Sequence, residues 1–259
     1  MSHYPSRHHP IYMLQDALHA QSVGAVFHRD TTSAGMWSLE IDGRLVVWCI
    51  DIRWQHERDA HEMDIRGLQD NGALICCAQK QDAAHFGGKW LPLAVTPGYA
   101  PPEQPVTKLT DVAFVGYIRD KEREQMLLDI NSKFSLSSVQ GQFGADAVSN
   151  YHQARLGVNV PTRYGHPQAY DSANMRLFEV MATETPVVTP RAEYLADLGL
   201  VNEHNCFMYD SPQDLLDVIE KALSGRYDLD GIGEEASYLC NERHTYTHRA
   251  TQVMEWLDE

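Results

Sequence analysis

The chain has 259 residues, of which 43% are hydrophobic, and it carries a formal net charge of −15 at pH 7. This composition is that of a globular protein, and no apolar run reaches the roughly 18 residues that a membrane-spanning helix needs. The negative charge argues against non-specific nucleic-acid binding, and the missing signal-peptide core favours a cytoplasmic protein without stable membrane insertion.

The first part of the chain alternates short helices with apolar strands. The runs WSLEI and RLVVWCI flank Asp42-Gly43, a dipeptide that is typical of a tight hairpin turn. We expect helices at 11–20, 57–70 and 79–86, and strands at 37–41, 44–50, 73–78 and 89–95. Residues 96–110 contain four prolines and no apolar periodicity, which indicates a linker. We therefore predict an N-terminal acceptor-side α/β domain over 1–105 and a second domain over 106–259.

The second part alternates strands and helices more regularly. We expect strands at 111–115, 134–138, 156–160, 186–190 and 206–209, and helices at 119–131, 145–154, 174–183, 211–223 and 228–258. Such alternation predicts a parallel sheet with both faces covered by helices. Ligands of such sheets bind beyond the carboxyl ends of the strands, which draws attention to 116–119 and to the loop at 161–174.

The segment DSANMRLFE (171–179) begins a helix after a long polar loop. Arg176 and Glu179 are three residues apart and share its polar face. The free N–H groups of a helix N-terminus favour an anion such as a diphosphate, to which Arg176 could add a charge-assisted bond. Glu179, one turn further, could accept both hydroxyls of a ribose. The alternative is a surface Arg–Glu pair on an amphipathic helix.

Other candidate residues stand alone at strand ends or in loops. Gly116 directly follows the strand DVAFV, where a glycine allows close approach of a ligand, and Arg119 begins the next helix. Asp51 ends the strand RLVVWCI and is a candidate base for an acceptor hydroxyl, or else a turn residue. His166 lies in the loop at 161–173, which could contact the donor or the acceptor, or could serve only as a lid.

Metal and redox chemistry find little support in the residue patterns. Asp228-Leu229-Asp230 matches a metal-binding D-x-D pattern, but it lies between two expected helices rather than after a strand. The histidines lack H-E-x-x-H spacing, and the five cysteines contain no C-x-x-C pair. We expect no bound metal, no resident cofactor and free buried thiols.

The second half resembles the glycosyltransferase domain of the CgeB-like (spore maturation protein) family, a branch of the group-1 transferases with the GT-B fold. The matching segments, in the order of that family, are DVAFVG (111–116), YHQARLGVNV (151–160), DSANMRLFEVMATETPVVTP (171–190) and NERHTYTHRATQVMEWL (241–257). The first half resembles the end of the N-terminal domain of that family, which is usually larger.

The resemblance implies a GT-B-like α/β fold, with two Rossmann-like halves built on parallel sheets and a reduced N-terminal half. It implies transfer of a sugar without a metal ion, with the helix dipole and arginines stabilising the leaving diphosphate. It places the ribose at Glu179. The donor contacts that it implies are Gly116, Arg119, Asp171, Asn174, Arg176 and Glu179.

Our hypothesis is a glycosyltransferase that moves a sugar from a nucleoside diphosphate sugar, by default a UDP-sugar, to a hydroxyl acceptor. The acceptor could be a carbohydrate, a protein, a lipid or modified DNA. The alternatives are a DNA glycosyltransferase that acts on hydroxymethylated pyrimidines of viral DNA, a nucleotide-sugar epimerase, and a non-catalytic nucleotide-sugar-binding protein. No residue pattern identifies the sugar, the acceptor, the stereochemistry or the oligomeric state.

Overall fold

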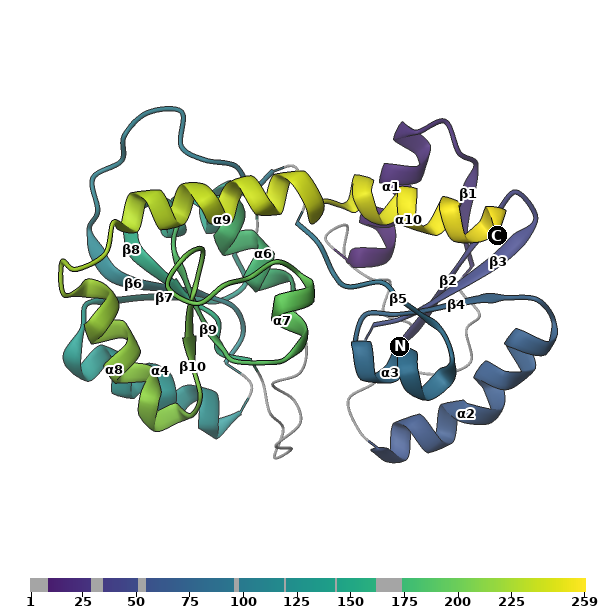
Figure 1. Cartoon of the computed structure of the whole chain (residues 1–259), viewed down its shortest axis with the longest axis horizontal. Helices are drawn as coiled ribbons and strands as arrows, with labels where there is room; N and C mark the ends of the chain where they lie inside the picture. The colour runs from purple at the N-terminus through teal and green to yellow at the C-terminus, as the bar shows by residue number, and fades with distance from the viewer. Residues whose placement is uncertain are drawn as a thin grey trace. The chain divides into compact units, whose positions relative to one another are not determined.

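The computed structural model describes residues 9–28, 35–50, 55–95, 98–118, 120–142, 144–161 and 174–259, with the backbone alone at 55–60. The chain forms two compact units (Figure 1): Met1–Ala94 with Thr245–Glu259, and Val95–His244. The Pro-rich segment thus belongs to the second unit and the last helix to the first, whereas the sequence suggested one division at residue 105. The two crossings between the units are adjacent, because the Val95 N–H donates to the His244 carbonyl at 2.9 Å.

The first unit is built on a mixed five-stranded sheet. Its order is β1 (Ala25–His28), β2 (Met36–Ile41), β3 (Arg44–Cys49), β4 (Leu74–Cys77) and β5 (Lys89–Trp90). The neighbours β3, β4 and β5 are parallel, while β1, β2 and β3 are antiparallel. The expected hairpin forms, with positive φ at Asp42 and Gly43. Because this hairpin reverses the chain, the first sheet contains antiparallel pairs and differs from the purely parallel sheet that the resemblance implied.

Helices cover both faces of this sheet. They are α1 (Pro10–Ala20) and α10 (Tyr246–Asp258), which pack together, and α2 (Gln55–Asp70) and α3 (Lys80–Phe86). Trp48 lies edge-on to Tyr246 of α10 at 6.4 Å, while its neighbours in β3 pack with Ile65 of α2. The buried Arg249 of α10 donates to the Pro92 carbonyl at 2.8 Å. This bond holds the last helix against the segment that follows β5. The strand β5 is short because Pro92, just beyond it, lacks the N–H that a further bond of the sheet would need.

The second unit has a parallel five-stranded sheet, as predicted. Its order is β10 (Phe207–Tyr209), β9 (Val187–Pro190), β8 (Ala154–Val158), β6 (Thr110–Val115) and β7 (Leu136–Val139). On one face α4 (Lys121–Lys133) packs beside α8 (Pro212–Leu223). On the other lie α6 (Met175–Ala182) and α9 (Leu229–Arg243) (Figure 1), and α5 (Ala145–His152) packs against β6 and β8. A short helix, α7 (Tyr194–Asp197), follows β9.

Alternating residues of the strands separate the two faces. Phe114 of β6 and Leu156 of β8 pack in the core under α4 and α8. On the other face, a Cβ at Gly157 would overlap the side chain of Val180, so this glycine lets α6 approach β8 closely. The position of α6 over the sheet, and hence of its N-terminus, depends on that contact.

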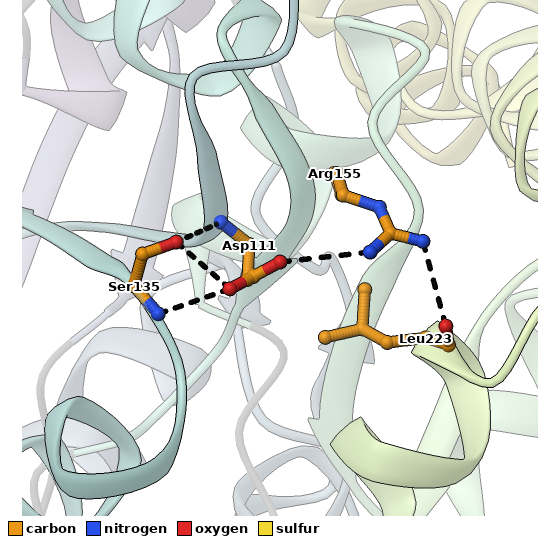
Figure 2. A network of polar contacts seen from close by, with 4 residues as sticks. All are labelled: Asp111, Ser135, Arg155 and Leu223. Atoms are coloured by element: carbon orange, nitrogen blue, oxygen red, sulfur yellow. Dashed lines mark hydrogen bonds and ion pairs between the residues drawn. The ribbon is translucent and has the colours of Figure 1, made fainter.

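Polar groups join the amino ends of three strands (Figure 2). Asp111 at the start of β6 accepts from the Ser135 hydroxyl at 2.8 Å and from the Ser135 N–H at 3.0 Å. Arg155 of β8 pairs with Asp111 at 3.5 Å and donates to the Leu223 carbonyl at the end of α8. Burial alone would raise the pKa of Asp111, but Ser135 and Arg155 together lower it. This network joins the amino ends of the strands. The carboxyl ends of the strands, at the opposite end of the sheet, remain available for a site.

The expected helix over 228–258 is two helices. Thr245 caps α10 by accepting from the His248 N–H at 3.4 Å, and its extended backbone separates α10 from α9. The cap signal at Ser211 is confirmed, because its hydroxyl accepts from the Asp214 N–H at 3.2 Å. The strand β1 and the helix α7 were not expected.

Candidate functional site

Several polar groups meet where β6 and β8 end and α6 begins. Gly116 follows β6 directly, Asn159 follows β8, and Asn174 is the N-cap residue of α6. These positions lie beyond the carboxyl ends of parallel strands, which is the edge where ligands bind in such sheets. The edge is therefore a candidate ligand site.

The two asparagines hold the start of α6 in place. The Asn174 side-chain oxygen accepts from the Leu177 N–H at 3.3 Å, and its amide nitrogen donates to the Asn159 side-chain oxygen at 2.9 Å. Asn159 in turn donates to the Thr189 hydroxyl at 3.1 Å. In the part of the chain that the structure describes, the N–H groups of Met175 and Arg176 have no acceptor. As far as the described residues go, these two amides and the positive end of the helix dipole are available to an anion.

Arg176 braces the strand ends rather than pairing with Glu179. Its Nε donates to the Val115 carbonyl at 2.6 Å, and its Nη1 lies 3.4 Å from both the Asn159 side-chain oxygen and the Val160 carbonyl. The guanidinium stacks on the Phe114 ring, 4.6 Å from the ring centroid. Its Nη2 has no acceptor among the described residues, so part of the charge can still bind a ligand.

Gly116 has a steric function that the sequence did not suggest. A Cβ at this position would overlap the Arg176 guanidinium and would also lie 3.2 Å from the Phe114 ring. Only glycine leaves the space through which Arg176 reaches the Val115 carbonyl. The position of the Arg176 side chain therefore depends on the glycine at position 116.

Glu179 lies one turn after Arg176, between residues that are fully buried, and keeps part of its own surface accessible. Burial raises the pKa of Glu179 to about 7, although the Arg176 guanidinium and the Tyr99 hydroxyl both lower it. Among the described residues, no group donates to the Glu179 carboxyl with hydrogen-bond geometry, although Tyr99 lies close enough to lower its pKa. The carboxyl thus has acceptor positions that no described residue fills, which is costly for a largely desolvated charge unless water or a ligand fills them.

Two buried tyrosines lie near enough to Glu179 for its charge to raise their pKa. Tyr99 comes from the Pro-rich segment and is 6% exposed, while Tyr151 of α5 is completely buried. Burial raises the pKa of both phenols, and the Glu179 charge raises it further. The Tyr151 hydroxyl has no partner with hydrogen-bond geometry in the described part of the chain.

The structure brings together Gly116, Asn174, Arg176 and Glu179 of the residues singled out from the sequence. The other candidates, Asp51, Arg119, His166 and Asp171, lie outside the described residues, and their roles stay predictions. Sequence reasoning missed Asn159 and Tyr99. A polar residue near the end of the apolar strand LGVNV was a usable signal for Asn159, but nothing in the linker distinguished Tyr99.

Other parts of the chain agree with simpler interpretations. Asp228 caps α9, because its side-chain oxygen accepts from the Gly231 N–H at 3.1 Å. Across the described ranges, no group of three or more His, Cys, Asp or Glu residues is arranged to hold a metal ion. The five cysteines are free and buried. None of the described helices combines the length and apolar character needed to cross a membrane.

Solved structures share the fold of this chain at low sequence identity. Sucrose-phosphate synthase from Thermosynechococcus elongatus aligns with a TM-score of 0.58 and 12% identity, over 77% of this chain and 61% of that protein. A variant of S. aureus TarM, in complex with fondaparinux, α-GlcNAc-glycerol and UDP, aligns with a TM-score of 0.56 and 9% identity, over 79% of this chain and 46% of TarM. Anabaena HepE with UDP-glucose aligns with a TM-score of 0.55 and 12% identity, over 76% of this chain and 68% of HepE. The chain thus spans about three fifths of the synthase and less than half of TarM.

These neighbours are GT-B proteins, and they support the α/β fold with two Rossmann-like halves. A sequence search of curated proteins finds no significant match. The model of the glycosyl transferase-like family matches residues 123–255, which is more than half of the chain and includes α6 with Arg176 and Glu179. The chain belongs to the glycosyl transferase-like family.

Proposed function

We propose that this protein transfers a sugar from a nucleoside diphosphate sugar, by default a UDP-sugar, to a hydroxyl acceptor. The family match supports sugar transfer. The polar groups where β6 and β8 end and α6 begins have the chemistry that we expect of a donor site. We also propose that the chain belongs to the CgeB-like branch, on the segments that resemble it.

The observation that carries the proposal is the Glu179 carboxyl with its open acceptor positions. A carboxylate can accept from two adjacent hydroxyls at once, and the ribose of a nucleotide offers such a pair. A ligand that bonds to the ionised form would also offset the desolvation that raises the pKa of this group. No bond from Arg176 to the carboxylate, among the described residues, competes with such a ligand.

The start of α6 suits the diphosphate of the same ligand. The open N–H groups of Met175 and Arg176 and the Nη2 of Arg176 could each donate to a phosphate oxygen, and the helix dipole adds favourable charge. The same groups would stabilise the diphosphate as it leaves, so we propose transfer without a metal ion. Arg119 and Asp171 are proposed as further donor contacts.

The titles of the structural neighbours suggest the nucleotide. HepE was solved with UDP-glucose and the TarM variant with UDP. On this fold-level analogy a UDP-sugar is our proposed donor. We propose Asp51 and His166 as candidate catalytic residues for the acceptor hydroxyl. The acceptor class stays a prediction, as do the epimerase and non-catalytic alternatives.

Thermal-shift measurements with UDP-, GDP-, ADP- and TDP-sugars test the donor. A ligand at a hundredfold excess over its Kd stabilises by about 2.7 kcal/mol, which raises Tm by several degrees. We expect a shift with a UDP-sugar, which Glu179→Gln strongly reduces and Glu235→Gln, on the exposed face of α9, does not. A shift of equal size in both variants would contradict the ribose assignment. Product analysis without an acceptor separates transfer from epimerisation.

A further inference from the structure

An exposed aromatic ring lies directly beside the candidate site. Among the described phenylalanine, tyrosine and tryptophan residues, only Tyr117 and Tyr238 are exposed, at 43% and 67%. Tyr238 lies on α9, far along the chain from the groups described above. Tyr117 follows Gly116, the position at which a Cβ would overlap the Arg176 guanidinium. Because a phenol ring is largely apolar, its exposed face is area that a ligand can cover.

The backbone that carries this ring is held from two directions. The Tyr117 carbonyl accepts from Nη1 of Arg123 at 2.6 Å, and the Ile118 N–H donates to the side-chain oxygen of Gln140 at 3.1 Å. Arg123 is itself buried, and its guanidinium lies 5.7 Å from the centroid of the Phe114 ring. Both bonds use main-chain atoms of the turn after β6, so they do not depend on the side chain at position 117.

The Tyr117 ring extends toward the loop that leads from β7 to α5. A Cβ at Gly141 in this loop would lie 3.5 Å from the Tyr117 hydroxyl and 3.9 Å from its Cε1. Gly141 has a φ of 69°, a backbone conformation that favours glycine. The loop supports one side of the ring, and the rest of the ring stays exposed at the carboxyl edge of the sheet, where ligands bind.

The chemistry of the ring suits a planar ligand group. In the proposed function the diphosphate lies at Arg176 and the start of α6, and only the ribose separates a nucleobase from that diphosphate. Nucleobases stack on aromatic side chains because both groups have flat π faces, and every base offers such a face. The sugar of the donor is not planar, so the base fits the exposed ring better.

We propose that Tyr117 is a further binding residue of the donor site and that its ring stacks on the nucleobase of the nucleoside diphosphate sugar. This inference rests on the proposed function, since it takes the diphosphate to lie at Arg176. It adds a contact for the base, to which neither Arg176 nor Glu179 has been assigned.

The first experiment measures the affinities of UDP, UDP-glucose and inorganic pyrophosphate by calorimetry. Wild type is compared with Tyr117→Ala, with Tyr117→Phe, which keeps the ring, and with Tyr238→Ala, which removes the other exposed ring. We expect Tyr117→Ala to bind UDP and UDP-glucose about tenfold more weakly than wild type and to bind pyrophosphate equally well. The other two variants should follow wild type. Thermal melts check that all variants are folded.

The second experiment detects the contact itself. Nuclear Overhauser effects between the base protons of bound UDP and tyrosine ring protons are recorded near saturation. We expect them in wild type and in Tyr238→Ala, and we expect them to be strongly reduced in Tyr117→Ala. Because stacking tolerates any base, another nucleoside diphosphate replaces UDP in both experiments if the thermal-shift screen selects it.

The outcomes separate this proposal from the proposed function. If wild type binds a nucleotide and Tyr117→Ala binds it equally well, the role of Tyr117 is wrong while the proposed function stands. A loss confined to UDP-glucose would assign the ring to the sugar, and an equal loss for pyrophosphate would mean a disturbed anion site; either result overturns the stacking. A loss in Tyr117→Phe as large as in Tyr117→Ala would overturn it as well. If wild type binds no nucleotide, the proposed function itself fails.

Discussion

Replacing Glu179 by Gln should change the pH dependence of the stability of the second unit. Burial raises the pKa of Glu179 from 4.5 to about 7 in the folded protein. A carboxyl whose pKa is raised by folding contributes most to stability below its unfolded pKa, and this contribution is lost as pH rises through the folded pKa. Wild type should therefore lose stability between pH 5 and 8 through this one group, and Glu179→Gln should not.

The magnitude follows from the size of the shift. A pKa shift of one pH unit corresponds to about 1.4 kcal/mol. Most of the pKa shift of Glu179 takes effect between pH 5 and pH 8, where it amounts to roughly 2 kcal/mol in the free energy of unfolding. The difference between the variant and wild type should thus grow in favour of the variant by about that amount from pH 5 to pH 8. Other groups titrate equally in both proteins and cancel in the difference.

The assay can report the two units separately. All five tryptophans lie in the first unit: Trp37, Trp48, Trp54, Trp90 and Trp256. Tryptophan fluorescence in urea therefore follows the first unit, whereas circular dichroism of tyrosine and backbone also reports the second, which contains Glu179. The pH-dependent difference should appear by dichroism and not by fluorescence. If the variant and wild type differ equally at pH 5 and pH 8, Glu179 is not the desolvated carboxyl described above.

Three further substitutions test the packing around the site. Gly116→Ala should displace the Arg176 guanidinium and weaken UDP-glucose binding about tenfold, as measured by calorimetry. The loss of stability should be smaller than the loss of binding free energy, because the Arg176 side chain can move. Undiminished binding would contradict the steric role of this glycine. Gly157→Ala should destabilise the second unit by about 1–3 kcal/mol in urea unfolding, and adding Val180→Ala should restore part of that loss; simple additivity of the two changes would argue against the contact. Asp111→Asn should cost about 1 kcal/mol near pH 7, because its pKa is lowered in the folded state and its contribution is present above the unfolded pKa. The cost should fade in acid as pH falls through the lowered pKa of Asp111, and a cost that is the same in strong acid as at pH 7 would contradict the network in Figure 2.

Much of the local structure was predictable because it depends on neighbouring residues. Asp42-Gly43 predicted the hairpin, and Ser211 with Pro212 predicted the start of α8, since turn and cap preferences act over a few bonds. The short linker to α10 was missed because Thr245 interrupts a pattern that otherwise reads as one helix. The β5 region was expected to be longer because apolar residues continue past Pro92 without forming a ladder.

The site was predictable only in part. Helical spacing was enough to place Arg176 and Glu179 on one side of α6, with Asn174 at its start. That spacing also allowed a surface ion pair between the two side chains, and local sequence could not choose between the alternatives. The choice depends on the Val115 carbonyl and the Phe114 ring, which are about sixty positions away in the sequence.

By itself, the sequence determined the alternation of strands and helices, the turns and caps, and the residue types at the carboxyl edge of the second sheet. Only the tertiary structure decided that Arg176 turns to the end of β6 and that burial raises the pKa of Glu179. It also decided that the last helix packs with the first unit. The physical reason is that burial and hydrogen-bond partners are set by segments far apart in the chain. Propensity and spacing describe each segment alone, whereas the pKa of Glu179 depends on all the groups that pack around it.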